Sequence, residues 1–486
     1  MWAERQLPRT NDARVPLNNV PRQPDLGRGF KESEKGCSRY GHRRLWCGAA
    51  PPPPNPMPNA FFLLAVLLTV AALSSYLNHR FIGLPTTVAL MGISLALALG
   101  TVGLSKLGWP LQSMVEHLLA EVDLSKALLG GALSFLLFAG ALHIEFEELH
   151  EQRWRVLTLA FLSTTLSLFL VAGMAWYVFH WLGLQIPLLY CLIFGSLISP
   201  TDPVAVLGLL KKAGAPLSLE TKITGESLFN DGVGIVGFSV FLDSLLATGP
   251  QMDVVWSDAL LLLVREAGGG IALGWTLGWV TVQLIKGIDH YPVEVLLTLA
   301  LVSGGYALGM ELHVSGPLIV ATAGLIVGHY GRKTAMSETS RQNLDSFWEL
   351  MDEVLNALLF VLVGLQVTAL RWEYDYLVAA LVMTVLVLVA RAVSVGVPTG
   401  VLRVFGGAVE RHGIVLLTWG GLRGAISVAL ALSLPPGREH DLILTVTYGI
   451  VAFSILVQGT TLPWLLRRLL GPTPPSGAEN RAQEAA

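Results

Sequence analysis

Apolar runs long enough to cross a lipid bilayer recur through most of this 486-residue chain, from Ala60 to Leu470. Many of them approach the ~20 residues that a helix needs to span the hydrocarbon core. Charged residues make up only 14% of the chain, whereas about a quarter of the residues of a soluble domain are charged. In lipid, a helix satisfies its own backbone polar groups within one segment. The sequence therefore predicts an all-α, polytopic transmembrane helical bundle.

About thirteen candidate spans can be drawn along the chain. They lie near residues 60–77, 83–101, 126–144, 155–179, 187–210, 223–248, 258–286, 293–311, 315–328, 347–370, 376–398, 413–434 and 442–466. If the first span starts outside, the inner loops carry fourteen Lys and Arg residues and the outer loops carry four. Because cytoplasmic loops are enriched in these residues, the count favours an odd number of spans and a cytoplasmic C-terminus.

Two of these spans are interrupted by residues that helices in lipid rarely contain. Span five contains SPTDP, which runs from Ser199 to Pro203, and span twelve contains TWGGLRGAISVAL around Arg423. The two spans are seven apart, so they take corresponding positions in two halves of six spans joined by a linker span. Interrupted helices at matching positions are typical of transporters built from inverted repeats, with the site at the repeat interface.

The predicted division of the chain follows from this symmetry. Residues 57–250 form a first repeat of six spans, residues 258–286 form the linker span, and residues 290–470 form a second repeat of six spans. Residues 1–56 are polar and rich in Arg and Pro, which predicts either a disordered leader or a mis-assigned start before a working Met57. Residues 471–486 are expected to form a short disordered tail.

The first interruption places several oxygen atoms at one depth in the membrane. Pro203 has no amide proton to donate to the carbonyl of Ser199. In lipid such a carbonyl is costly unless it lines a wet cavity or coordinates a ligand. Thr201 and Asp202 add a hydroxyl and a carboxylate beside it. Because oxygen atoms are the ligands of small hard cations, the stretch predicts half of a cation site; the alternative is a proline kink stabilised by its neighbours.

The next span carries further polar groups in GESLFNDG. Glu226 and Asn230 are four residues apart, as are Ser227 and Asp231, so the four side chains occupy one sector of a helix. A charge near the bilayer centre costs about 2.5–3.5 kcal/mol on insertion scales. The three acids of these two spans, which include Asp202, must therefore be paired, protonated or occupied by ions.

Two arginines within predicted spans can pair with these acids. They are Arg391 in LVARAVSV and Arg423 in GGLRGA. Three acids and two arginines leave one carboxylate over, and that carboxylate is the candidate for exchanging protons against metal ions. The alternative for either arginine is that it snorkels to a membrane interface.

These motifs together resemble a known family. TDPVAVLGLLKKAG followed by GESLFNDGVGIV resembles the paired signature of the sodium/proton antiporters, in the branch that contains bacterial NhaP-type proteins and animal sodium/proton exchangers. WGGLRGAISVAL resembles the third signature of that branch, and FWELMDEVLNALLFVLVGL also fits it. The resemblance covers essentially residues 60–470. It implies a thirteen-helix inverted-repeat fold and a homodimer in the plasma membrane that exchanges Na⁺ (or Li⁺, or K⁺) for H⁺ without a cofactor or a nucleic-acid partner.

The resemblance also implies which residues hold the ions. Asp231 would bind the cation and the proton alternately, and Ser227 and Thr201 would hold Na⁺ with it. Glu226 would lie beside the site, and the neutral Asn230 before the key aspartate matches the electroneutral branch of the family.

Three further residues have implied supporting roles. Asp202 would stabilise the crossing of the broken helices, Arg391 would pair with Glu226, and Arg423 would lie in the second broken helix. The short C-terminal region departs from the animal exchangers, which carry long regulatory tails, and this favours a bacterial-type protein.

Three other classes of protein fit these residues less well. A cation channel is expected to show rings of ligands around a pore, and no filter-like repeat is visible. An intramembrane enzyme would need a nucleophile with a base, but Ser227 lies in a predicted helix rather than after a strand. A transporter of organic anions would need unpaired arginines, whereas acids outnumber arginines here.

Overall fold

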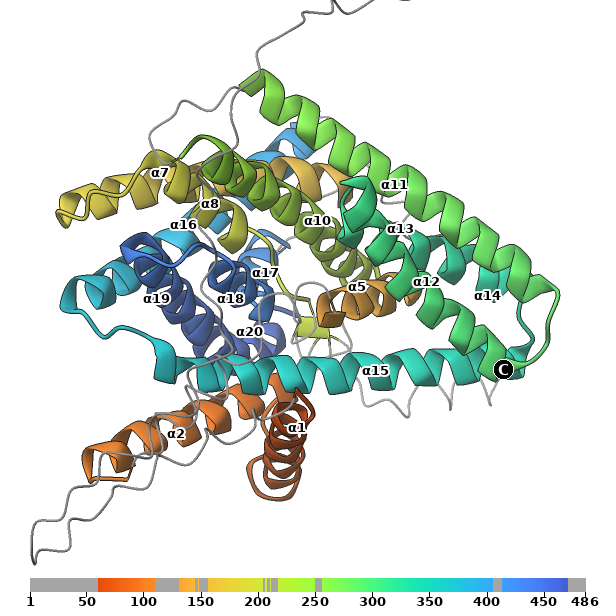
Figure 1. Cartoon of the computed structure of the whole chain (residues 1–486), viewed down its shortest axis with the longest axis horizontal. Helices are drawn as coiled ribbons and strands as arrows, with labels where there is room; N and C mark the ends of the chain where they lie inside the picture. The colour runs from red at the N-terminus through yellow and green to blue at the C-terminus, as the bar shows by residue number, and fades with distance from the viewer. Residues whose placement is uncertain are drawn as a thin grey trace, which may run out of the picture. The chain divides into compact units, whose positions relative to one another are not determined.

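The computed structural model describes residues 60–109, 131–144, 147, 156–203, 206–207, 210, 217–249, 256–404 and 413–470 (Figure 1). The predicted leader at residues 1–56 and the predicted tail at residues 471–486 lie outside the described residues. Among the residues described, all regular elements are helical. This confirms the all-α class predicted from the sequence.

The α-helices are α1 (Ala60–Leu77), α2 (Thr86–Lys106), α5 (Leu133–Leu142), α7 (Thr164–Trp181), α8 (Leu188–Ile198), α10 (Leu217–Thr248), α11 (Trp256–Lys286), α12 (Tyr291–Leu312), α13 (Gly316–Ile326), α14 (Arg332–Thr334), α15 (Glu338–Leu365), α16 (Tyr374–Val404), α17 (Gly413–Trp419), α18 (Ala425–Leu432), α19 (Arg438–Phe453) and α20 (Gly459–Leu470). Shorter segments continue several of them, namely the π-helices η1 (Asn78–Ile82), η3 (Thr158–Ser163), η4 (Val327–Gly331) and η6 (Ser454–Gln458) and the 3₁₀ helix η5 (Gln366–Ala369).

Nine helical segments in the described part of the chain are long and apolar enough to cross a membrane, and α5 and α8 are shorter apolar helices. Each of the thirteen predicted spans overlaps a helix. The number of helices that cross the membrane, and the division into two repeats, stay predictions.

The start of α15 differs from the predicted span, which begins at residue 347. The helix begins at Glu338 because Ser337 caps it: the Ser337 hydroxyl oxygen accepts a hydrogen bond from the backbone N–H of Ser340 at 3.3 Å. A serine at this position satisfies an amide that has no partner within the helix. The first turns of α15 are polar, so hydropathy alone places the start too late.

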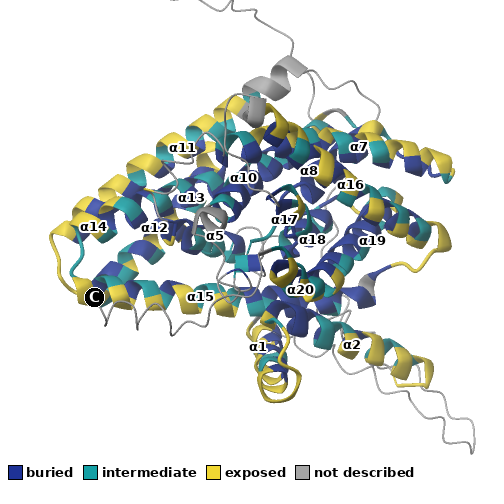
Figure 2. Ribbon diagram, turned by 180° about the vertical axis from the view of Figure 1, so that it is seen from behind, coloured by how far each residue is buried: buried dark blue, intermediate teal, exposed yellow. Residues whose placement is uncertain are grey.

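Apolar side chains cover the outward faces of the bundle as well as its core. Figure 2 shows exposed residues along the outer sides of α7, α11 and α16. Among them are large apolar side chains such as Tyr177, Leu381 and Trp275. A soluble protein rarely exposes contiguous apolar surface of this kind, whereas spans in contact with lipid require it.

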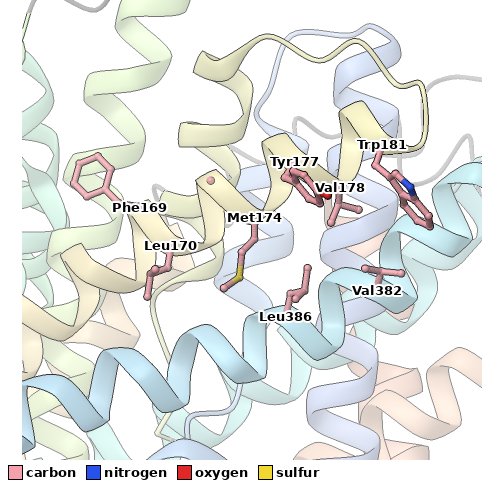
Figure 3. Close-up of a pocket in the computed structure, with 9 residues that line it drawn as sticks. Phe169, Leu170, Met174, Tyr177, Val178, Trp181, Val382 and Leu386 are labelled. Atoms are coloured by element: carbon pink, nitrogen blue, oxygen red, sulfur yellow. The ribbon is translucent and has the colours of Figure 1, made fainter.

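A shallow groove runs between α7 and α16 on such a face (Figure 3). Leu170, Met174 and Trp181 line it from α7, and Val382 and Leu386 line it from α16. None of its lining residues is acidic or basic. The groove is therefore a feature of the lipid-facing surface and not a candidate ion site.

Close packing of α8 against α10 fixes the position of the first helix break. A methyl group added at Gly234 would lie 2.1 Å from Cγ of Pro200 and 3.1 Å from the carbonyl oxygen of Ser196. Such a contact is far inside van der Waals distance, so only glycine allows α10 to approach the break. Small residues permit this kind of close approach between membrane helices.

Replacing Gly234 by alanine is expected to destabilise the protein by about 1–3 kcal/mol, because overpacking forces rigid groups apart. The proline ring cannot move aside as a flexible side chain would. The measurement is the thermal unfolding midpoint in detergent. Gly396→Ala in α16 is the matched control, since no atom lies within 4 Å of an added methyl group there. Equal midpoints for the two variants would contradict the packing argument.

Candidate functional site

The two predicted interruptions are both present, and they meet. After α8 ends at Ile198, residues 199–203 are not helical, and a second non-helical stretch, residues 420–424, separates α17 from α18. The backbone N–H of Asp202 donates a hydrogen bond to the carbonyl oxygen of Leu422 at 2.8 Å, which makes an isolated antiparallel bridge. The breaks thus cross, and some of the backbone groups freed in one are satisfied by the other.

Arg423 neutralises the C-terminal end of α8. Its Nη1 donates hydrogen bonds to the carbonyl oxygen atoms of Ser199 and Pro200, the latter at 2.7 Å. The Ser199 carbonyl is the one that Pro203 leaves without an amide partner. A helix C-terminus carries partial negative charge, so the guanidinium satisfies both the hydrogen-bonding and the electrostatic need of the break.

Asp202 takes the opposite position at the N-terminal end of α18. A methyl group added at Gly424, which immediately precedes α18, would lie 2.3 Å from Oδ2 of Asp202. The carboxylate therefore rests on the backbone at the start of α18, where a helix carries partial positive charge. The third glycine of the motif around Arg423 is required because this carboxylate occupies the space of a side chain.

Arg391 pairs with Glu226 inside the bundle. Its Nη2 lies 2.7 Å from Oε1 of Glu226, and the two side chains are 3% and 2% exposed. Arg391 also lies over the second break, since a methyl group at Gly421 would be 2.7 Å from its Nε. The expected pairing is thus present. Arg423 is equally buried, so the snorkelling alternative is wrong for both arginines.

Ser227 and Asn230 hold the first break from the side of α10. The Ser227 hydroxyl donates to the carbonyl oxygen of Thr201. The Asn230 amide donates to the Thr201 hydroxyl at 2.8 Å, and its oxygen accepts from the Thr201 backbone N–H at 3.3 Å. Ser227 bonds to a carbonyl rather than to a base, so it is not arranged as an enzyme nucleophile.

Asp231 remains as the carboxylate without a direct partner. It is 5% exposed and lies one helical turn after Ser227 on α10. It interacts electrostatically with Asp202 and Arg423, but within the described residues it forms no ion pair of its own. Glu226 is paired and Asp202 rests on a helix end, which leaves Asp231 as the one acid of the three predicted from the sequence with neither arrangement among the described residues.

Several supporting groups escape sequence reasoning. The Ser454 hydroxyl accepts from the backbone N–H of Arg423 at 2.9 Å, and Gln458 donates to the carbonyl oxygen of Trp419 at 3.2 Å. Both residues belong to η6, and π-helical turns are frequent at functional sites. Asp352 on α15 interacts electrostatically with Asp202. The only sequence feature that marks Ser454, Gln458 and Asp352 is that each is a polar residue within an apolar span. Their partners cannot be predicted from it, because these lie far away in the sequence.

The chain matches a family model described as "Sodium/hydrogen exchanger, transmembrane" over residues 66–468. It belongs to this family. It is 46% identical over 416 residues to the Na⁺/H⁺ antiporter NhaP of Pseudomonas aeruginosa, covering 85% of this chain and 97% of that protein. It is 34% identical over 416 residues to the Na⁺/H⁺ antiporter NhaH of Halobacillus aidingensis, covering 84% of this chain and 96% of that protein.

A solved structure confirms the fold of this family member. The sodium proton antiporter MjNhaP1 of Methanocaldococcus jannaschii matches with a TM-score of 0.68 over 85% of this chain and 99% of that chain. The two sequences are 19% identical, so this likeness concerns the fold alone.

Replacing Arg391 by alanine is expected to lower stability by about 3–5 kcal/mol, because it leaves the buried Glu226 carboxylate without its partner. The thermal midpoint in detergent measures the loss. Arg371→Ala is the matched control: Arg371 also forms an ion pair, with Asp441 at 2.8 Å, but it is 68% exposed. Exposed pairs contribute about 0–1 kcal/mol.

A double variant separates the pair from the arginine alone. In Arg391→Ala/Glu226→Gln no buried charge is left unpaired, so the double variant should be more stable than Arg391→Ala. A double variant less stable than Arg391→Ala would show that Arg391 does not stabilise the bundle by compensating Glu226.

Proposed function

We propose that this protein is a secondary antiporter that exchanges Na⁺ for H⁺ across the plasma membrane, with Asp231 as the shared binding group. The observation that carries the proposal is the position of Asp231, a buried carboxylate beside the crossing of two broken helices that forms no ion pair with any residue the structure describes. Membership of the sodium/hydrogen exchanger family and the names of the relatives support it.

Competition at a single carboxylate is enough to couple the two ions. A protonated Asp231 offers no charge to Na⁺, and an Asp231 that binds Na⁺ cannot hold the proton. Oxygen atoms of Ser227 and Thr201 lie at the facing break and would complete the coordination of a dehydrated cation. Rocking of one part of the bundle against the other would then expose the loaded site to either side in turn.

The charges around the site support electroneutral exchange. Asp202, Glu226 and Asp231 face the two cations Arg391 and Arg423, so one further positive charge balances these five side chains. Either H⁺ or Na⁺ supplies that charge. Both loaded states are therefore neutral, and Asn230, which is uncharged, adds no second titrating group beside Asp231. Li⁺ and K⁺ remain candidate substrates at the same oxygen atoms.

Orientation and assembly complete the proposal. The excess of Lys and Arg in alternate loops supports a cytoplasmic C-terminus. A homodimer is proposed from the family resemblance alone. Nothing in the proposed cycle requires a cofactor or a catalytic step, so the protein acts as a carrier of ions and not as an enzyme.

Asp231→Asn is expected to abolish exchange while the protein stays folded, because the amide has the shape of the carboxyl group but cannot titrate. In the unchanged protein, the apparent KM for Na⁺ should rise about tenfold per pH unit on the acidic side, as expected for one competing proton. Initial rates of Na⁺-driven proton flux in proteoliposomes measure both effects. A flat KM with a falling maximal rate would rule out competition at one carboxylate.

Exchange should be insensitive to membrane potential, because each loaded form of the site carries the same charge. A potassium diffusion potential set with valinomycin, with Na⁺ as the substrate, tests this in proteoliposomes. The control is the same vesicle without a potassium gradient. A clear change of rate with voltage would mean that a second titrating group moves with Asp231.

A further inference from the structure

We propose that the protein holds a second cation site, for a monovalent cation such as Na⁺, where α12 and α15 begin. Its oxygen atoms come from the carboxylates of Asp289 and Glu294 and from the hydroxyl groups of Ser337 and Ser340. These residues lie outside the broken helices and take no part in the proposed exchange at Asp231.

The four side chains converge from two separate segments. Ser337 donates to Oδ1 of Asp289 at 2.7 Å. The hydroxyl oxygen of Ser340 lies 3.2 Å from Oε1 of Glu294 and 3.4 Å from the same Oδ1 of Asp289. Asp289 is exposed, whereas Ser340 and Glu294 are buried. The cluster is thus open to the aqueous phase at Asp289 and ends at Glu294.

The cluster contains fewer proton donors than its carboxylates require. The single hydroxyl proton of Ser340 faces two carboxylate oxygen atoms and can satisfy only one of them. Glu294 is 0% exposed, and its Oε2 has no hydrogen-bond partner among the described residues. A buried carboxylate with one oxygen atom unpartnered and no compensating cation is strongly unfavourable. This buried, unpartnered oxygen is what indicates a missing positive ligand.

Basic side chains near the start of α15 do not supply that charge. Three of them pair with other acids: Arg341 with Glu338, Arg332 with Asp345, and Lys333 with Glu147. No ion pair to Asp289 or Glu294 occurs in the part of the chain that the structure describes.

The spacing of the oxygen atoms suits a hard cation. Metal–oxygen bonds of about 2.3–2.6 Å, as for Ca²⁺, place neighbouring ligands of an octahedron about 3.3–3.7 Å apart. Na⁺ is of similar size to Ca²⁺. The separations of Ser340 from Glu294 and Asp289, 3.2 and 3.4 Å, lie near this range. The 2.7 Å hydrogen bond between Ser337 and Asp289 is shorter than this range, so the Ser337 hydroxyl would have to move away from Asp289 to share one ion with it.

The charge balance favours a monovalent cation over a divalent one. Two carboxylates contribute two negative charges. The N-termini of α12 and α15 both lie at the cluster, with Glu294 in the first turn of α12 and Ser337 capping α15. Each helix N-terminus is equivalent to about half a positive charge. About one negative charge is left, which one Na⁺ would neutralise.

Such a site would couple the cation concentration at one membrane face to the arrangement of α15. The positive-inside count places this end of the bundle on the cytoplasmic side. A bound ion would tie the start of α15 to the start of α12. Farther along, α15 packs against α18 and carries Asp352, which interacts with Asp202 at the crossing. Cytoplasmic Na⁺ would thereby stabilise the packing of α15 beside the transport site.

The test uses the full chain with Asp231→Asn, in which the transport carboxylate is removed. Thermal midpoints in detergent are measured with NaCl and with choline chloride at equal ionic strength. Na⁺ is expected to raise the midpoint of this variant, and adding Glu294→Gln should remove the rise while leaving the midpoint in choline unchanged or higher. Adding Asp289→Asn should shift the half-effective Na⁺ concentration at least tenfold upward. Glu338→Gln, at an exposed acid beside Ser337, is the matched control and should keep the rise.

Three results would distinguish the presence of the second site, its preference for a monovalent cation and the proposed function. A midpoint insensitive to Na⁺ in Asp231→Asn, or a rise that survives both Glu294→Gln and Asp289→Asn, overturns the second site. A rise with CaCl₂ or MgCl₂ but not with NaCl overturns its monovalent character. Asp289 is exposed, so its variant keeps the test decisive if Glu294→Gln does not fold. Failure of exchange in the unchanged protein would count against the proposed function and not against this site.

Discussion

The crossing of the two broken helices depends on two complementary contacts, in which a charged side chain from each break compensates the end of the other helix. A helix that ends in lipid leaves up to four amide groups without partners at its N-terminus and up to four carbonyl groups at its C-terminus. Here the arginine of the second break donates to the carbonyl groups that end α8, and the aspartate of the first break rests on the start of α18. Each broken helix therefore stabilises the other, and neither break would be tolerable alone.

The rest of the site is built around this crossing by close backbone contacts. Gly234 lets α10 approach Pro200, Gly421 leaves space for the Arg391 side chain, and Gly424 leaves space for Asp202. Each glycine is needed because a specific atom from another helix occupies the position of its side chain. The Glu226–Arg391 pair and the contacts of Asn230 with Thr201 then hold α10 at the crossing.

The parts of this arrangement that the sequence predicted are those that stand out against an apolar background. Proline, aspartate and arginine within a span are costly in lipid, so both breaks, the buried acids and the need for pairing can be read from composition and spacing. The identity of the surplus acid is different. It depends on the pairing of Arg391 with Glu226 and on the hydrogen bonds from Arg423 to backbone carbonyl groups. These contacts join residues more than a hundred positions apart. Serine and glutamine in η6 carry no local pattern that reveals their partners.

The surplus of one acid over the arginines has a consequence for the return step of the carrier. An unloaded core would hold one uncompensated negative charge in a medium of low polarity, and moving that charge between two faces of the membrane is far more costly than moving a neutral core. In the proposed cycle, the empty protein would therefore stay open to whichever side released its ion until another ion binds. Under the proposed exchange this penalty would suppress slippage without a separate gate, because the carrier would return only after another ion has bound.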